Sequence, residues 1–155
     1  MLFRSSSDES DDNPADNTDT AITTVTNSGG GGTTNGVDLT GEWGQVTTKC
    51  KGKSLPQKCT VKGRLTIMNL GETPAPSSFV RFYLSDDGVF DGSDMPLKQE
   101  ATGKIKFGKD KHKTLSAKLP AGVDPTGKFI IAVIDVNNTV AEDDETNNIV
   151  VFGPL

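Results

Sequence analysis

Hydrophobic and polar residues alternate along several short segments between residues 37 and 155, and this period of two predicts β-strands. In "CTVKGRLTIMN", residues 59–69, the apolar Val61, Leu65 and Ile67 share one face, while lysine, arginine and threonine share the other. The segment "KFIIAVID", residues 128–135, is instead continuously apolar, which is typical of a central strand covered on both faces.

Turn-forming Gly, Pro, Asn and Asp residues separate these segments, and no segment shows the 3.6-residue period of a helix. The pattern predicts strands near residues 37–48, 59–69, 78–85, 103–108, 112–119, 128–135 and 147–152. We therefore expect an all-β fold, an antiparallel β-sandwich of about seven strands, with a small barrel as the alternative.

Residues 1–36 have a different composition, rich in Ser, Thr, Asp, Asn and Gly, and they contain few apolar residues. Such a segment cannot bury enough apolar area to offset the entropy lost on ordering. We expect residues 1–36 to be a disordered acidic and Gly-rich tail or linker, and residues 37–155 to form one domain.

The formal net charge of −5 is carried by the tail alone, because residues 37–155 contain equal numbers of acidic and basic residues. A neutral domain is not typical of a nucleic-acid-binding protein. No run of 18 apolar residues is present, so we expect no membrane insertion by this chain. The start "MLFRSSSDES" lacks the apolar core of a signal peptide, so anchoring would require a signal missing from this sequence.

Catalytic chemistry has little support in the sequence. The single histidine, His112, lies in the lysine-rich "GKDKHKT", where we expect an exposed turn without the orienting partner and nucleophile that a general base requires. The sequence therefore predicts a protein that is not an enzyme.

Two cysteines, Cys50 and Cys59, flank a short loop that contains Gly52 and Pro56. Two thiols alone cannot complete a zinc site. The spacing suits a structural disulfide that closes a hairpin-like loop, and two free thiols are the alternative.

Two acidic segments are candidate calcium sites, because calcium prefers six to eight oxygen ligands. The first contains Asp86, Asp87, Asp91 and Asp94; the second contains Asp135, Asn137, Glu142, Asp144 and Glu145. Neither matches the spacing of a helix–loop–helix calcium loop, and Asp, Asn and Gly also recur where the backbone turns, which is the alternative role. If the strands at 78–85 and 128–135 are antiparallel neighbours, the two segments lie at opposite ends of the domain and cannot share one ion.

Trp43 and Tyr83 could belong to the core or form a platform for sugars. A carbohydrate platform requires two or three exposed aromatic residues in a row, and the sequence shows none. We expect Trp43, the only tryptophan, to fill or cap the core.

The segments "VRFYLSDDGVFDGSDMPL" (80–97) and "FIIAVIDVNNTVAEDDETNN" (129–148) together resemble the bacterial cell-adhesion-related domain family, CARDB. The resemblance rests on Tyr-Leu-Ser before an acidic turn, on a strand ending in Asp135, and on Glu-x-Asn-Asn at 145–148. "NLGETPAP" (69–76) is similar to the Asn-x-Gly turn of the family. The cysteine loop and the lysine-rich residues 98–114 depart from the family pattern.

The resemblance implies an immunoglobulin-like sandwich in an extracellular or cell-surface setting of a bacterium, with no shared catalytic residue. We expect a non-enzymatic spacer or adhesion module with a protein or cell-surface partner, and calcium is the candidate stabilising ion. The alternative is a carbohydrate-binding accessory module of a larger secreted protein or hydrolase.

Overall fold

The computed structural model describes residues 36–52 and 57–155, so the predicted disorder of residues 1–35 lies outside the described part of the chain. The strands are β1 (Leu39–Lys51), β2 (Lys58–Asn69), β3 (Phe79–Ser85), β4 (Met95–Ala101), β5 (Asp110–Lys118), β6 (Phe129–Val133) and β7 (Ile149–Phe152). No helix occurs in these two ranges.

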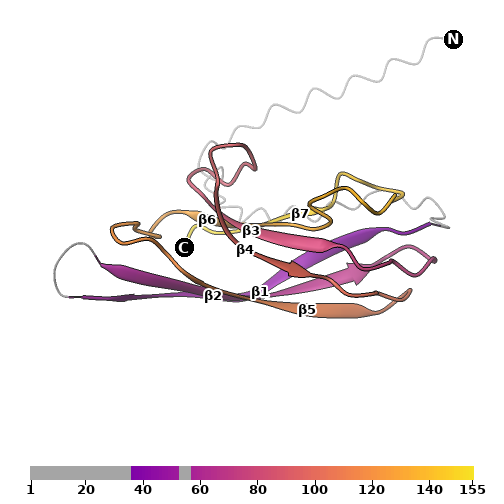
Figure 1. Cartoon of the computed structure of the whole chain (residues 1–155), viewed down its shortest axis with the longest axis horizontal. Coiled ribbons are helices and arrows are strands. Elements are labelled where there is room, and N and C mark those ends of the chain that lie inside the picture. Colours follow the sequence, from indigo (N-terminus) through magenta and orange to yellow (C-terminus); the bar gives the residue numbers. More distant parts are fainter. Residues whose placement is uncertain (1–35, 53–56) are drawn as a thin grey trace, which may run out of the picture. The chain divides into compact units, whose positions relative to one another are not determined.

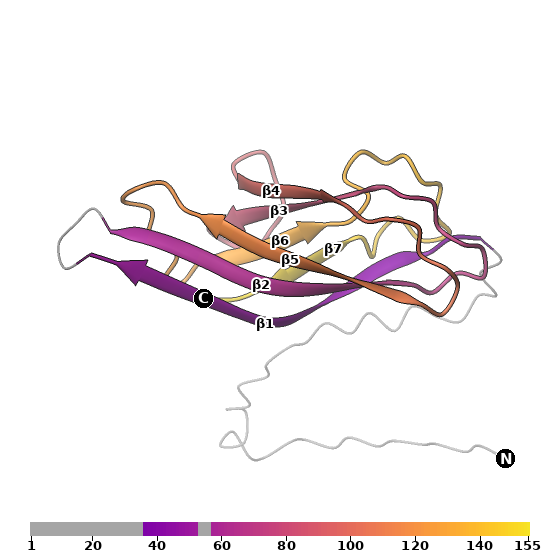
Figure 2. The same cartoon turned by 60° about the horizontal axis from the view of Figure 1, so that its bottom comes forward.

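The strands form two antiparallel sheets, with the orders β1-β2-β5 and β4-β3-β6-β7, and the two sheets form the layers of a sandwich (Figures 1 and 2). This confirms the all-β prediction of a seven-stranded antiparallel β-sandwich.

The core lies between the two sheets. The inward face of β2 contributes Val61, Leu65 and Ile67, all fully buried, as the alternating pattern predicted. Phe82 and Ile130 oppose them from the second sheet and are equally buried. The burial of these side chains supplies the main favourable free energy of the fold.

Strand β6 is covered on both faces, as its continuous apolar sequence predicted. Ile130 and Ala132 belong to the core between the sheets, while Ile131 and Val133 form a second cluster with Tyr83. These four of the five β6 residues are at most 9% exposed.

The prediction of a strand at residues 103–108 is wrong. The fourth strand of the structure is β4, which spans Met95–Ala101. Only Ile105 in the predicted segment forms a bridge, to Ala75, and its single buried side chain gave the apolar signal. Gly103 and Gly108 have φ values of +73° and +64°, which extended strands do not adopt. Strand β4 escaped prediction because its residues are half-buried or exposed and carry little apolar periodicity.

Strands β3 and β6 pair in antiparallel register, with Ser85 opposite Phe129 and Arg81 opposite Val133. The acidic segment 86–94 leaves β3 at one end of this pair, and residues 135–148 leave β6 at the other end. The expectation that the two acidic loops lie at opposite ends of the domain is therefore confirmed.

Candidate functional site: two acidic loops and a lysine-lined hollow

The start of the 86–94 loop is held by hydrogen bonds to Asp87. Its Oδ1 accepts from the amide of Val89 at 2.9 Å and from the hydroxyl of Ser85 at 3.2 Å. The Ser85 hydroxyl also accepts from the amide of Gly88, whose φ is +77°. Asp87 thus acts within the turn that reverses the chain after β3.

The remaining aspartates of this loop are also engaged separately. Asp91 Oδ1 accepts from the amide and hydroxyl of Ser93 at 2.7 and 2.6 Å, and these bonds hold the pKa of Asp91 below its ordinary value. Asp94 Oδ2 accepts from the amide of Asp91 at 2.9 Å, and Asp86 pairs with Lys128. These contacts suit a turn-forming role for Asp87, Asp91 and Asp94, and the four carboxylates are not grouped to hold a metal ion.

The second loop begins at Asp135, which is 4% exposed and has a left-handed φ of 46°. Its two carboxylate oxygens accept from the hydroxyl of Thr139 at 2.9 Å and from the amide of Val140 at 2.7 Å. Aspartate tolerates this backbone conformation better than most residues do, because its short side chain can hydrogen-bond locally.

Glu142 joins this loop to the start of β1. Its carboxylate accepts from the amide of Leu39 and from Nδ2 of Asn148, the latter at 3.2 Å. Burial raises the pKa of Glu142 to about 7, against the lowering effect of these two bonds, and the neighbouring charges of Glu145 and Asp135 raise it further. Glu145 accepts from the Glu142 amide at 3.0 Å and also from Asn148.

Two buried amide oxygens in this loop lack a hydrogen-bond donor. They are Oδ1 of Asn147 and Oδ1 of Asn148. The other ends of the two amides are satisfied: Asn147 Nδ2 donates to Asp38 at 2.7 Å, and Asn148 Nδ2 donates to Glu142 and Glu145. Buried acceptors without partners are costly, and oxygen is the ligand that calcium prefers.

Not every predicted ligand joins this group. Asn137 is exposed, and Asp144 accepts from the amide and hydroxyl of Thr146, which lower the pKa of Asp144. Within residues 36–52 and 57–155, no three His, Cys, Asp or Glu side chains are grouped to hold a metal ion. The amide oxygen of Asn148 and the neighbouring carboxylates of Glu142 and Glu145 are oxygen ligands of the kind that a hard divalent cation prefers.

Sequence reasoning missed the part played by Asp38, which precedes β1 and is 7% exposed. Nothing in the local sequence links it to Asn147, because the contact spans 109 positions. The one available signal was a charged residue placed between the apolar Val37 and Leu39.

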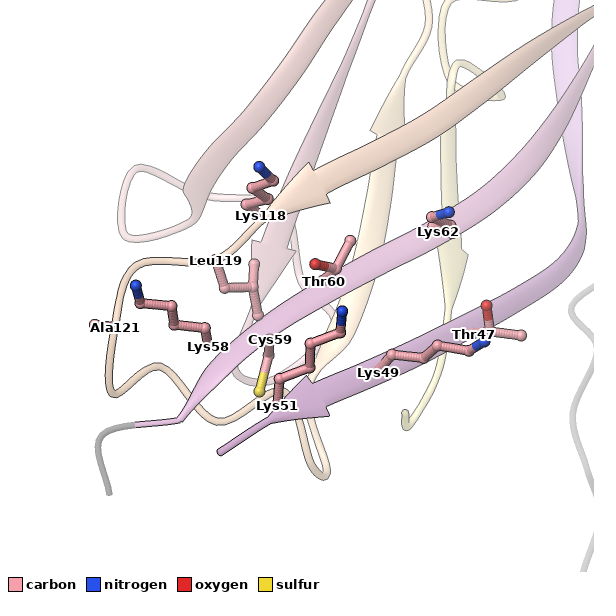
Figure 3. A pocket seen from close by; sticks show the side chains of 10 residues that line it. All are labelled: Thr47, Lys49, Lys51, Lys58, Cys59, Thr60, Lys62, Lys118, Leu119 and Ala121. Carbon is pink, nitrogen blue, oxygen red and sulfur yellow. The ribbon is translucent and has the colours of Figure 1, made fainter. Parts of the chain in front are cut away.

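A hollow of about 540 Å³ lies over one end of the β1-β2-β5 sheet (Figure 3). Its lining includes Lys49 and Lys51 from β1, Lys58 and Lys62 from β2, and Lys118 from β5. No sequence pattern had marked these residues as a group, because they come from three strands that only the sheet brings together.

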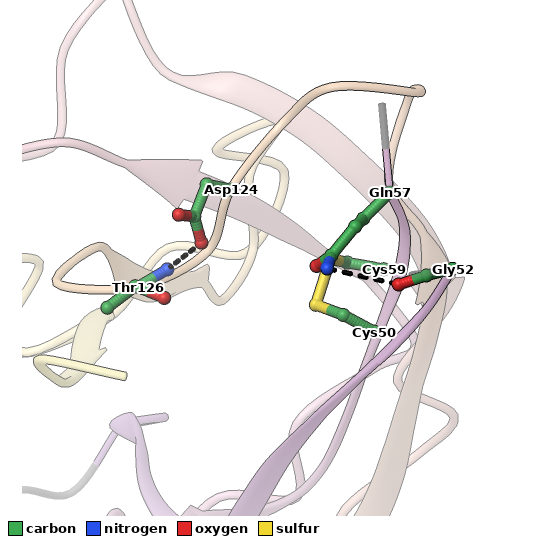
Figure 4. The surroundings of a disulfide bond; sticks show 6 residues. All are labelled: Cys50, Gly52, Gln57, Cys59, Asp124 and Thr126. Atoms are coloured by element: carbon green, nitrogen blue, oxygen red, sulfur yellow. Dashed lines mark hydrogen bonds between the residues drawn. A yellow bond between two sulfur atoms is a disulfide. The ribbon is translucent and has the colours of Figure 1, made fainter. Parts of the chain in front are cut away.

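Cys50 and Cys59 lie opposite each other on β1 and β2 and form a disulfide with a sulfur–sulfur distance of 2.06 Å (Figure 4). The predicted pairing is therefore confirmed. Next to it, Gln57 Nε2 donates to the carbonyl of Gly52 at 3.2 Å. The disulfide joins β1 to β2 at the end of the hairpin that carries the lysine-lined hollow.

Trp43 packs on the core as a half-buried side chain. Its ring lies 5.6 Å from that of Phe82, and its Nε1 donates to the carbonyl of Val150 at 3.0 Å. A Cβ atom at Gly63 would lie 3.0 Å from the Trp43 ring, so glycine leaves room for the indole. The indole therefore packs against the core of the domain, as expected.

His112 lies within β5 and not in a turn, which corrects its predicted position. The imidazole lies 3.1 Å from the Thr66 hydroxyl and 3.3 Å from the Asp110 carboxylate. The ring and the carboxylate are about half exposed on the open face of the sheet. Water therefore reaches this chain of polar groups, and a hydroxyl nucleophile there would lack a preorganised, water-excluded environment.

The described part of the chain contains no helix with the length and hydrophobicity needed to span a bilayer.

The CARDB family model matches residues 44–152. Among solved structures, the chain is similar to the crystal structure of the CARDB domain of the PF1109 protein from Pyrococcus furiosus, in complex with di-metal ions. That match has a TM-score of 0.52 and 23% identity, and it covers 79% of this chain and 90% of the other. The solution structure of the same archaeal domain matches with a TM-score of 0.50 and 25% identity, over 76% and 93% of the two chains. No curated protein matches this chain.

Proposed function

This chain belongs to the CARDB family, and we propose that it is a non-enzymatic spacer or interaction module of an exported protein, stabilised by calcium at residues 135–148. The family match confirms the resemblance identified from the sequence. The buried, unpaired amide oxygens of Asn147 and Asn148 are the observation that carries the calcium part of the proposal.

The setting outside the cytoplasm is supported by the Cys50–Cys59 disulfide, since such bonds persist mainly in oxidising compartments. The family supports a module that serves a larger protein and that contacts a protein or cell-surface partner. A carbohydrate platform at Trp43 receives no support, because the indole N–H is already satisfied by Val150.

The spacer role is supported by the way residues 135–148 are tied to the rest of the domain. Glu142 bonds to Leu39 and Asn147 bonds to Asp38, so the loop before β7 is tied to the start of β1. An ion bound between these segments would stiffen the domain near the point where the chain enters it.

Calcium is placed at residues 135–148 in this proposal because that loop offers acceptors without donors, whereas the aspartates of 86–94 already have partners. The crystal structure of the related archaeal domain with di-metal ions supports metal binding by a domain of this fold. Amide and carboxylate oxygens of Asn147, Asn148, Glu142 and Glu145 would hold the ion.

Thermal unfolding under non-reducing conditions, with millimolar calcium or with chelator, tests the proposal. A ligand that binds only the folded state raises the melting temperature, so we expect an upward shift with calcium. The shift should vanish in Glu142→Gln/Glu145→Gln and persist in the control Asp91→Ala/Asp94→Ala. No shift in the wild type, or a shift abolished only by the control, would overturn the assignment.

A further inference from the structure

The outer face of the three-stranded sheet carries a cluster of cations at its disulfide end. Six side chains point to this face: Lys49 and Lys51 on β1, Lys58, Lys62 and Arg64 on β2, and Lys118 on β5. We refer to these six residues as the lysine face. Threonine and serine lie between them, and the carboxylates of the same face, Glu42 and Asp110, lie toward the other end of the sheet.

Among the described residues, no ion pair compensates the charges of the lysine face. The ion pairs of the described residues are Lys98–Glu100, His112–Asp110 and Lys128–Asp86, and none involves the lysine face. Lys51 and Lys58 lie directly opposite each other in the register of β1 and β2. Like charges at such positions destabilise a sheet, so this arrangement has an energetic cost.

Protection of sheet edges does not explain the lysine face. Lysines often guard exposed edge strands against pairing with other chains, and that role suits β1 and β5. Strand β2, however, is the central strand of its sheet, and it carries Lys58, Lys62 and Arg64. The cations of a central strand therefore call for a different explanation.

We propose that the lysine face binds a linear anionic polysaccharide, one carrying carboxylate or sulfate groups. Along β2, residues 58 to 64 extend over about 20 Å, so the cations form a row and not a single-point site. A polymer with repeated charges can contact the whole row, whereas a small anion cannot.

The hollow on this face gives the polymer a place to lie. It has a volume of about 540 Å³, and Thr47 and Thr60 are among its lining residues, between the lysines (Figure 3). Hydroxyls can donate and accept hydrogen bonds, which suits sugar hydroxyl groups. The lysines supply charge, and the threonines supply directional contacts.

The same surface is poorly suited to nucleic acid. Proteins that bind single strands stack the bases on aromatic side chains, and the lysine face has none among its described residues. The Cys50–Cys59 disulfide at this end of the hairpin also favours a setting outside the cytoplasm, where anionic glycans are available partners.

The inference deepens the proposed interaction module and rests on that part of the proposed function, but it is independent of calcium. Binding of the full chain to heparin, alginate, neutral dextran and duplex and single-stranded DNA oligonucleotides would be measured between 50 and 300 mM NaCl, an approximate range in which such contacts weaken steeply. We expect binding to heparin or alginate, none to dextran, and weaker binding to DNA at equal salt.

The decisive variant is Lys58→Gln/Lys62→Gln/Lys118→Gln. Its control is Lys104→Gln/Lys106→Gln/Lys109→Gln, which removes the same charge from exposed residues outside the lysine face. We expect the first variant to weaken binding by about tenfold or more and to reduce the salt slope by about 2–3, and the control to change binding by less than about threefold.

Equal losses in the two variants would indicate non-specific charge attraction and overturn the proposal, as would tighter binding to DNA or no binding to either anionic polymer. The variant Lys58→Arg/Lys62→Arg/Lys118→Arg should retain binding. The calcium shift in melting temperature should also persist in the first variant, so a failed polysaccharide site is distinguishable from a failed calcium site.

Discussion

The carboxylate of Glu142 accepts a hydrogen bond from the main-chain amide of Leu39, the first residue of β1, across 103 positions of sequence. This contact ties the loop before the last strand to the start of the first one. Because the carboxylate is half-buried and close to two other acids, its ionisation is linked to folding.

The first prediction concerns pH. The pKa of Glu142 is raised to about 7 in the folded protein from an ordinary 4.5, so the folded state binds the proton more tightly. The protonated Glu142 carboxyl therefore contributes to the stability of the folded state. This contribution is complete below about pH 4.5 and is lost as the pH rises through about 7. The melting temperature of the wild type minus that of Glu142→Gln, measured with chelator, should therefore fall across this window.

A difference in melting temperature that stays constant, or that rises with pH, would contradict this assignment. If calcium binds at residues 135–148, the difference in melting temperature should depend less on pH when calcium is present, because a nearby cation favours the ionised carboxylate.

The second prediction concerns Asp135, where Asp135→Ala should lower the free energy of unfolding by about 2–4 kcal/mol. The change removes the acceptors of Thr139 Oγ1 and of the buried Val140 amide, and it places alanine at a φ of 46°. Urea unfolding measures the effect. Asp135→Asn is the control, since it keeps an acceptor and tolerates the left-handed backbone, and its loss should be smaller. Equal losses would mean that the charge itself is needed.

The third prediction concerns Asn69, which is 1% exposed and uses its whole side chain. Its Oδ1 accepts from the amides of Asp38 and Gly71 at 3.2 and 3.1 Å, and its Nδ2 donates to the carbonyls of Thr73 and Ile105 at 2.8 and 3.2 Å. Asn69→Ala would leave several buried groups unpaired, so we expect a loss of about 2–4 kcal/mol in urea unfolding.

The exposed Asn137 provides a matched control for Asn69, and Asn137→Ala should change the free energy of unfolding by less than about 0.5 kcal/mol. A similar small effect for Asn69→Ala would mean that the turn after β2 forms without this side chain.

The fourth prediction concerns the disulfide. Cys50 and Cys59 are nine positions apart, and replacing both by serine should lower the free energy of unfolding by about 2–3 kcal/mol, mainly by releasing the unfolded chain. Chemical reduction of the wild type should give the same loss in urea unfolding. If reduction had no effect, the bond would contribute nothing to stability.

The fifth prediction concerns Trp43. Because the indole packs on Phe82 and donates to Val150, its emission should be blue-shifted and only partly accessible to iodide. Neutral polysaccharides should leave the emission unchanged, with the urea-unfolded chain as the reference for full exposure. Quenching by a neutral polysaccharide would restore the carbohydrate-platform alternative.

Local sequence patterns were sufficient to predict a strand where each of its faces is either clearly buried or clearly exposed. The alternation of Val61, Leu65 and Ile67 and the apolar run of β6 each report directly on which faces are covered. Pairing of Cys50 with Cys59 was predictable because a short hairpin loop brings its own ends together. Strand β4 was missed because its position at the edge of its sheet leaves little apolar pattern.

The sequence by itself determined the class of the fold, the order of most strands and the presence of acidic turns, because these depend on periods of two and on residues that favour turns. Only the tertiary structure decided that Glu142 bonds to Leu39, that Asn147 bonds to Asp38, and that six cations from three strands form one face. Such contacts join residues far apart along the chain, and their geometry is fixed by the register and packing of the sheets, which no local pattern encodes.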